Sequence, residues 1–116
     1  MFEAVQEAGM TALRECDEDV ARMCALYERR RDTLVSALGT IGIEVAAPRG
    51  SIYVWAPVPE GHTSTSFAEM VLEEAAVVIS PGSMYGRSGE GFFRISLTTP
   101  DDRLVEAVER MRRHLS

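Results

Sequence analysis

Arg94 is the residue of this sequence whose type and position most clearly suggest chemistry. It belongs to the segment 92–97, in which Phe93, Ile95 and Leu97 alternate with the remaining residues as in a half-buried β-strand. A guanidinium on the opposite face of such a strand can donate parallel hydrogen bonds to both oxygens of a carboxylate. A surface arginine on a solvated strand face would show the same spacing. The pattern by itself therefore leaves a carboxylate site and a surface charge both open.

Two other features near this segment could take part in ligand binding. The segment 80–91 holds Pro81 and four glycines, and the backbone amides of such a loop can bind an anion. Its glycine spacing matches neither the phosphate-binding P-loop nor the dinucleotide-binding motif. Tyr53 and Trp55 are two residues apart in an alternating segment, so they share a face and could form either a pocket wall or part of the core.

Other kinds of reactive site have little support. His62 and His114 are far apart in the sequence and have no Cys or acidic residue at metal-ligand spacing, so we predict no metal site. No nucleophile-elbow motif indicates a hydrolase. All 12 basic residues are arginines, so this chain cannot itself supply a lysine that bonds covalently to a carbonyl compound. Mechanisms that need such a lysine are therefore excluded for this chain.

Composition indicates one globular domain without a nucleic-acid or membrane partner. The 116 residues are 46% apolar and carry a net charge of -6. The arginine clusters 29–31 and 110–113 are interleaved with acids and are predicted to be solvated helix faces. No apolar run approaches the roughly 20 residues of a membrane span, and Glu3 and Glu7 stand where a signal peptide would be apolar. A cytoplasmic location is expected.

Apolar periodicity predicts four helices and a small sheet. The helices are expected at 1–14, at Asp17–Leu38 with Gly39 as C-cap, after a capping box of Ser66 and Glu69, and after Thr99. Strands are expected at 43–45 and 51–56, joined as a hairpin, and at 77–79 and 92–97. The second helix should turn one face inward, formed by Val20, Met23, Cys24, Tyr27, Leu34 and Leu38. The predicted fold class is α+β, with a small, mostly antiparallel sheet packed against helices.

Four segments combine into a more specific pattern. They are 27–35 (YERRRDTLV), 48–55 (PRGSIYVW), 77–86 (VVISPGSMYG) and 89–97 (GEGFFRISL). In order and spacing they resemble the C-terminal small domain of the class I and II pyridoxal-phosphate-dependent aminotransferases, which have the aspartate aminotransferase fold. The resemblance covers the whole sequence, and the stretch 2–8 is most similar to enzymes like LL-diaminopimelate aminotransferase.

This resemblance implies roles for three residues. Arg94 matches the arginine that binds the α-carboxylate of the substrate, Tyr53 matches an aromatic residue near the pocket, and Gly50 matches a position where backbone approaches the pocket. Residues 1–15 would be an interdomain helix segment, and residues 16–116 the small domain itself. The large domain, with the catalytic lysine and the residues that bind pyridoxal phosphate, is absent from the sequence, so the resemblance implies no catalytic residue within this chain.

The implied function is that of one part of a larger enzyme. The intact protein would be a homodimeric aminotransferase acting on an amino acid and a 2-oxoacid, and the isolated chain, without its large domain, would be inactive. A β-lyase or a decarboxylase of the same fold remains an alternative, because such enzymes share the arginine. A ligand-binding module or a regulator domain derived from this fold is a further alternative.

Overall fold

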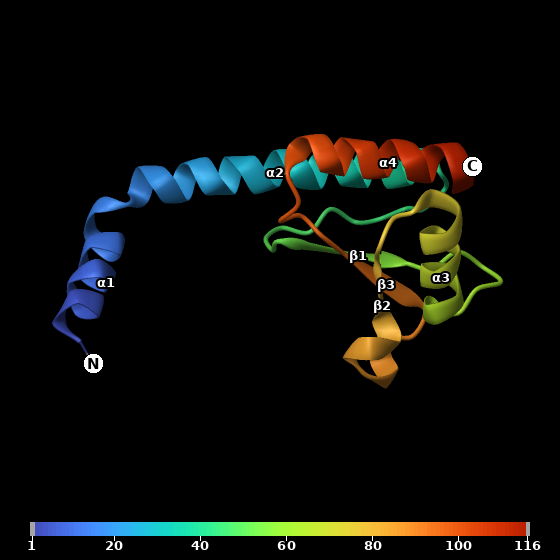
Figure 1. Ribbon diagram of the computed structural model, residues 1–116, viewed down its shortest axis with the longest axis horizontal. Helices are drawn as coiled ribbons and strands as arrows, with labels where there is room; N and C mark the ends of the chain where they lie inside the picture. Colours follow the sequence, from blue (N-terminus) through green and yellow to red (C-terminus); the bar gives the residue numbers. More distant parts are fainter. Residues whose placement is uncertain (1, 116) are drawn as a thin grey trace.

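A computed structural model describes residues 2–115 of the chain (Figure 1), which form four α-helices and one three-stranded sheet. The helices are α1 (Glu3–Glu15), α2 (Asp17–Thr40), α3 (Ser64–Ala75) and α4 (Asp101–Leu115). The strands are β1 (Tyr53–Pro57), β2 (Ser80–Pro81) and β3 (Phe92–Ser96), with the 3-10 turns η1 (Gly82–Tyr85) and η2 (Arg87–Gly89) between β2 and β3. The predicted α+β class is confirmed.

The sheet places Arg94 on its central strand. Its order is β1-β3-β2, and both pairings are antiparallel. In this register, Arg94 lies between Trp55 of β1 and Ser80 of β2. Because paired residues of neighbouring strands share a face, these three side chains lie on the same side of the sheet. The opposite face carries Val54 and Phe93, which are fully buried.

The core lies between this buried face and three helices. Phe67 of α3 packs its ring 5.1 Å from the ring of Phe93. Figure 1 shows α4 running alongside the C-terminal half of α2, which supplies the buried Leu34 and Leu38. The core cluster is Leu34, Leu38, Ile43, Val54, Ala56, Phe67, Val71, Ala75, Ile79, Phe93, Leu97 and Met111. The helices thus cover one face of the sheet and leave the face with Arg94 open.

The inward face predicted for the second helix is wrong in its N-terminal half. Val20 and Met23 are 58% and 47% exposed, and Cys24 is also exposed. Figure 1 shows α1 and the start of α2 extending away from the sheet, and α1 has no buried residue. Helical periodicity identifies an apolar stripe, but it does not tell whether the same chain covers that stripe.

The second helix also ends later than predicted. It continues through Gly39 to Thr40, and Gly42 adopts a φ of +82° beyond its end. The Ile43 N–H donates to the Leu38 carbonyl at 3.0 Å, which is the long bond of a Schellman motif. The side chains of Leu38 and Ile43 are both buried, as the hydrophobic contact of a Schellman motif requires. This contact explains why the helix ends before Gly42 and not before Gly39.

The capping box of α3 lies three residues before the predicted one. The Ser66 N–H donates to the Thr63 Oγ1 at 3.1 Å, and the Thr63 N–H donates to the Ser66 Oγ at 3.0 Å. Glu69 is therefore not part of the box. The earlier start brings Ser64 within hydrogen-bond distance of Glu90, a contact between distant segments that local spacing does not contain.

Two strand predictions are also wrong. Residues 43–45 form no strand, and β1 pairs with β3 instead of forming a hairpin with them. The strand expected at 77–79 is replaced by Ser80–Pro81, and Val78 is 81% exposed. Alternating apolar residues suit an extended backbone in general, whereas strand assignment requires a partner strand alongside.

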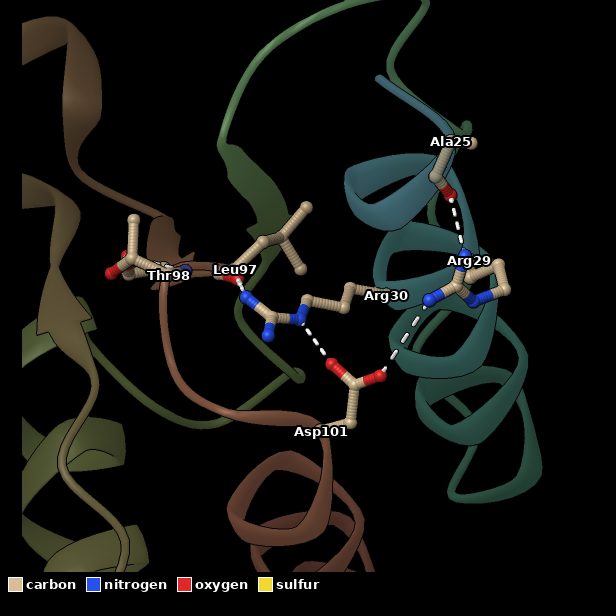
Figure 2. A network of polar contacts seen from close by, with 7 residues as sticks. Ala25, Arg29, Arg30, Leu97, Thr98 and Asp101 are labelled. Carbon is tan, nitrogen blue, oxygen red and sulfur yellow. Dashed lines mark hydrogen bonds and ion pairs between the residues drawn. The ribbon is translucent and has the colours of Figure 1, made fainter. Parts of the chain in front are cut away.

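The arginine cluster 29–31 is only partly solvated (Figure 2). Arg30 is 12% exposed, donates from Nη1 to the Leu97 carbonyl at 2.9 Å and pairs through Nε with the carboxylate of Asp101. Arg31 is 21% exposed and donates to the Pro48 carbonyl. Arg29 is 64% exposed and approaches Asp101 at 3.9 Å. Arg30 therefore ties α2 to the end of β3 and to the start of α4.

The half-buried Arg30 is expected to contribute more to stability than the exposed Arg29. Arg30→Met is expected to lower the free energy of unfolding by about 2 kcal/mol, because it leaves the Leu97 carbonyl and the Asp101 carboxylate without a shared donor. Arg29→Met, at an exposed site, is expected to change it by less than about 0.5 kcal/mol. Urea unfolding measures both values. Equal effects would contradict the role given to Arg30.

Candidate functional site

The guanidinium of Arg94 lies between two tyrosine rings. Its Cζ is 4.0 Å from the ring centroid of Tyr53 and 4.4 Å from that of Tyr85. Both distances are well inside the roughly 6 Å range of a cation–π contact. Tyr53 comes from β1, which pairs with β3 on one side, and Tyr85 comes from η1, which directly follows β2, the strand that pairs with β3 on the other side.

Arg94 differs from the other half-buried arginines in having no carboxylate partner. Arg30 and Arg31 pair with Asp101 and Asp32, and Arg110 pairs with Glu106. Between residues 2 and 115, no Asp or Glu forms an ion pair with Arg94. A guanidinium carries five N–H donors and is always charged at neutral pH. A half-buried cation of this kind is suited to an anion that comes from outside the chain.

Three partly exposed aromatic rings lie on the same face of the molecule as Arg94. The Trp55 ring lies edge-on to Tyr85 at 5.7 Å and stacks on Phe92 at 5.9 Å between centroids. These rings are 39%, 47% and 37% exposed, respectively. Contiguous exposed aromatic surface is typical of a face that binds a ligand or another protein surface. The open face of the sheet thus combines a cation with an aromatic lining.

The loop that carries Tyr85 is held by a close backbone contact. A Cβ added at Gly82 would lie 1.9 Å from the Gly89 carbonyl oxygen, and one added at Gly89 would lie 2.1 Å from that of Gly82. Neither glycine has a positive φ, so proximity rather than conformation requires glycine here. The two 3-10 turns are therefore packed backbone against backbone.

Glu90 fastens the same loop to the start of α3. The Ser64 N–H donates to its Oε1 at 2.8 Å, the Ser64 Oγ–H donates to its Oε2 at 2.9 Å, and the Gly91 N–H donates to Oε1 at 3.1 Å. The Ser83 N–H donates in turn to the buried Ser64 Oγ at 3.3 Å. This network connects η1 to α3 and so helps to place Tyr85.

The hydrogen bonds to Glu90 make stability depend on pH. The Ser64 backbone bond, followed by the Ser64 side chain and Gly91, lowers the pKa of Glu90 below its ordinary value of 4.5. A carboxyl whose pKa is lower in the folded state stabilises the fold above its unfolded pKa, and the stabilisation is lost as the pH falls through the folded pKa. Glu90→Gln is therefore expected to reduce the loss of melting temperature between pH 6 and pH 3.

Glu73→Gln, at an exposed position of α3, is the matched control for this measurement. It is expected to leave the difference in melting temperature between the two pH values close to that of the unmodified chain. If Glu90→Gln behaves like Glu73→Gln, the Ser64 hydrogen bonds do not contribute to the acid sensitivity of the fold.

The structure brings together Arg94 and Tyr53 but not Gly50. A Cβ at Gly50 would meet no atom within 4 Å among residues 2–115, and its contact with a substrate stays a prediction. Gly50 lines a groove of about 570 Å³ between α2 and the segment 48–52. Tyr85 was missed as a site residue, although it lies in the glycine-containing segment 77–86, because its contact with Arg94 depends on how the loop folds.

Metal binding and membrane spanning find no support in the described part of the chain. Among residues 2–115, no three His, Cys, Asp or Glu side chains gather in a way that could hold a metal ion. No helix in the same range combines the length and apolar character needed to cross a bilayer.

Comparison with known proteins identifies the family. Residues 2–111 match the model of the family described as aminotransferase class I and II. The chain belongs to this family. The resemblance seen in the sequence is thereby confirmed, and the fold agrees with it. The LL-diaminopimelate aminotransferase of Chlamydomonas reinhardtii superposes on this chain with a TM-score of 0.88 at 27% identity, covering 100% of this chain and 29% of that one.

Curated relatives agree with this family. The chain is 53% identical to the LL-diaminopimelate aminotransferase of Desulforudis audaxviator over 97% of its own length. It is 51% identical to the enzyme of the same name from Moorella thermoacetica over 98% of its length. In both comparisons the chain spans 29% of the length of the relative.

Members of the family generally depend on pyridoxal phosphate, and the residues of this chain do not fit that cofactor by themselves. An enzyme of this type holds the aldehyde of the cofactor through a lysine, and the sequence contains no lysine. The site around Arg94 offers instead one cation between aromatic rings. That arrangement suits the carboxylate of a substrate.

Proposed function

We propose that this chain is the carboxylate-binding part of an enzyme that moves an amino group between an amino acid and a 2-oxoacid. The observation that carries the proposal is Arg94, a half-buried cation between two tyrosine rings that has no acidic partner among residues 2–115. Tyr53 and Gly50 complete the proposed substrate-binding residues. Family membership supports the reaction class.

Arg94 would act by orienting the substrate. Its parallel N–H groups bind both carboxylate oxygens, which fixes the direction of the bond from the carboxylate to the α-carbon. A reacting carbon held in one orientation loses less entropy on the way to the transition state. Residues outside this chain would supply the cofactor and the proton transfers. The chain on its own would therefore bind substrate weakly and would not convert it.

The proposed partner is a larger domain of the same enzyme. Residues 16–116 would form the small domain, and residues 1–15 would connect it to the larger one. The absence of any buried residue in α1 and the exposed rings of Trp55 and Tyr85 support this arrangement, because both surfaces have room for a further domain. The intact protein is proposed to be a homodimer in the cytoplasm.

The test compares the full-length protein encoded around this chain with the 116-residue chain alone. The names of the relatives make LL-diaminopimelate the first donor to try, with a panel of 2-oxoacids as acceptors. We expect the full-length protein to form a new amino acid from the acceptor, and the chain alone to form none. Loss of the amino group or of carbon dioxide without transfer would indicate a lyase or a decarboxylase. Binding without turnover would indicate a regulator.

A further inference from the structure

We propose that Tyr85 is a positioning residue that holds the guanidinium of Arg94 ready for a carboxylate, acting together with Tyr53. This inference rests on the proposed function of Arg94. The guanidinium lies over both rings, at 4.0 Å and 4.4 Å from their centroids. A ring that attracts a cation leaves its N–H donors free, and those donors lie in the guanidinium plane. A carboxylate binds at the edge of that plane.

The contacts of Arg94 with Tyr53 and Tyr85 favour ligand binding because a free arginine side chain is flexible. An arginine has about 2 kcal/mol of rotamer entropy to lose when it is immobilised on a ligand. Rings that already hold the guanidinium reduce this loss at the moment of binding. The rings also stabilise the charge of Arg94, as an acidic side chain would. Unlike an acidic side chain, a ring does not occupy the N–H donors that a ligand needs.

Tyr85 itself is held before any ligand arrives. Its element, η1, begins at Gly82, whose backbone packs against that of Gly89. Trp55 contacts the Tyr85 ring edge-on at 5.7 Å, and Glu90 ties the loop to α3 through Ser64. The loop therefore fixes the position of the Tyr85 ring, which lies 4.4 Å from the Arg94 Cζ.

The test measures kcat and KM of the full-length protein for its amino donor. Tyr85→Leu is expected to raise KM about tenfold, with kcat changed less than about threefold, because the lost contact with Arg94 weakens ground state and transition state alike. Tyr85→Phe keeps the ring and is expected to leave KM within about twofold of the unmodified value. Met84→Leu changes the exposed neighbouring residue of the same loop and serves as the matched control.

A second measurement does not depend on activity. In side-chain NMR spectra of the full-length protein, the two rings should shift the Arg94 guanidinium resonance upfield and slow its rotation. Tyr85→Phe should keep both effects, and Tyr85→Leu should reduce both. If Tyr85→Leu does not fold, the shift and the slow rotation in the unmodified protein and in Tyr85→Phe still decide whether the rings hold the guanidinium.

The outcomes separate this inference from the proposed function. If Arg94→Gln leaves KM and kcat unchanged, the carboxylate role of Arg94 is wrong. If Arg94→Gln is impaired while Tyr85→Leu behaves like Met84→Leu, Arg94 binds carboxylate without help from Tyr85, and the positioning role is wrong. If Tyr85→Phe is as impaired as Tyr85→Leu, the hydroxyl rather than the ring is what matters, and this inference is overturned.

Discussion

Arg94→Gln in the full-length protein is expected to lower kcat/KM for the amino donor by about 10²- to 10³-fold. The substitution removes the charge and the parallel pair of N–H donors, and hydrogen bonds to a charged group contribute about 1.5–3 kcal/mol each. Arg94→Lys should recover only a minor part, because an ammonium cannot bind both carboxylate oxygens with parallel bonds. Steady-state kinetics with the donor identified for the full-length protein measure the effect.

Arg87→Gln is the matched control for this prediction. Arg87 is an exposed arginine of η2, a few residues before Arg94 in the chain, so the substitution removes the same charge from the same region. We expect kcat/KM to stay within about twofold of the unmodified value, as is usual for an exposed charge. A similar loss in both variants would mean that the positive charge of this region attracts the substrate, and that the parallel N–H donors of Arg94 have no specific role.

Gly82→Ala is expected to lower the free energy of unfolding by about 3 kcal/mol, the upper part of the range for overpacked sites. The added methyl group would lie 1.9 Å from the Gly89 carbonyl oxygen and 2.5 Å from that of Phe92. Both atoms belong to the backbone, so relief of the clash must move η1, η2 or the start of β3. Urea unfolding of the 116-residue chain measures the change.

Gly39→Ala provides the control with the opposite sign. A Cβ at Gly39 would meet no described atom within 4 Å, and the residue lies inside α2 with an ordinary helical φ. Alanine is favoured over glycine in a helix interior by about 1 kcal/mol. We therefore expect Gly39→Ala to raise the free energy of unfolding. If Gly82→Ala is as stable as the unmodified chain, the contact between the two turns is looser than its distances indicate.

Local patterns in the sequence were sufficient for most of the secondary structure. The 3.6-residue apolar periodicity located all four helices, and the alternation around Phe93 and Ile95 located β3, because both patterns arise from short-range backbone geometry. The absence of lysine excluded covalent attachment of the cofactor to this chain. The ordered motifs, including 77–86 and 89–97, indicated the family that the comparisons confirmed.

Choices between local alternatives were decided by contacts between distant residues. Gly39 and Gly42 could each end α2, and the burial of Ile43 favours Gly42. Two polar pairs, Thr63 with Ser66 and Ser66 with Glu69, could each begin α3, and the bonds of Ser64 to Glu90 favour the first pair. The same holds for β1, for which the sequence pattern predicts a hairpin with residues 43–45 and which pairs with β3 instead. Propensity describes what a segment can form, whereas packing selects one form.

The character of the site was decided by the tertiary structure. Alternation showed that Arg94 faces away from the core, but a solvated arginine and a ligand-binding one share that pattern. The fold adds that Tyr53 and Tyr85, 32 residues apart in the chain, both lie within 4.4 Å of the guanidinium, while no acidic residue between 2 and 115 pairs with it. Spacing along the chain does not encode such neighbours, because they depend on how β1 and η1 pack around β3. The sequence by itself thus determined which residue could bind a carboxylate, and the fold decided that its charge has two aromatic neighbours and no acidic partner among residues 2–115.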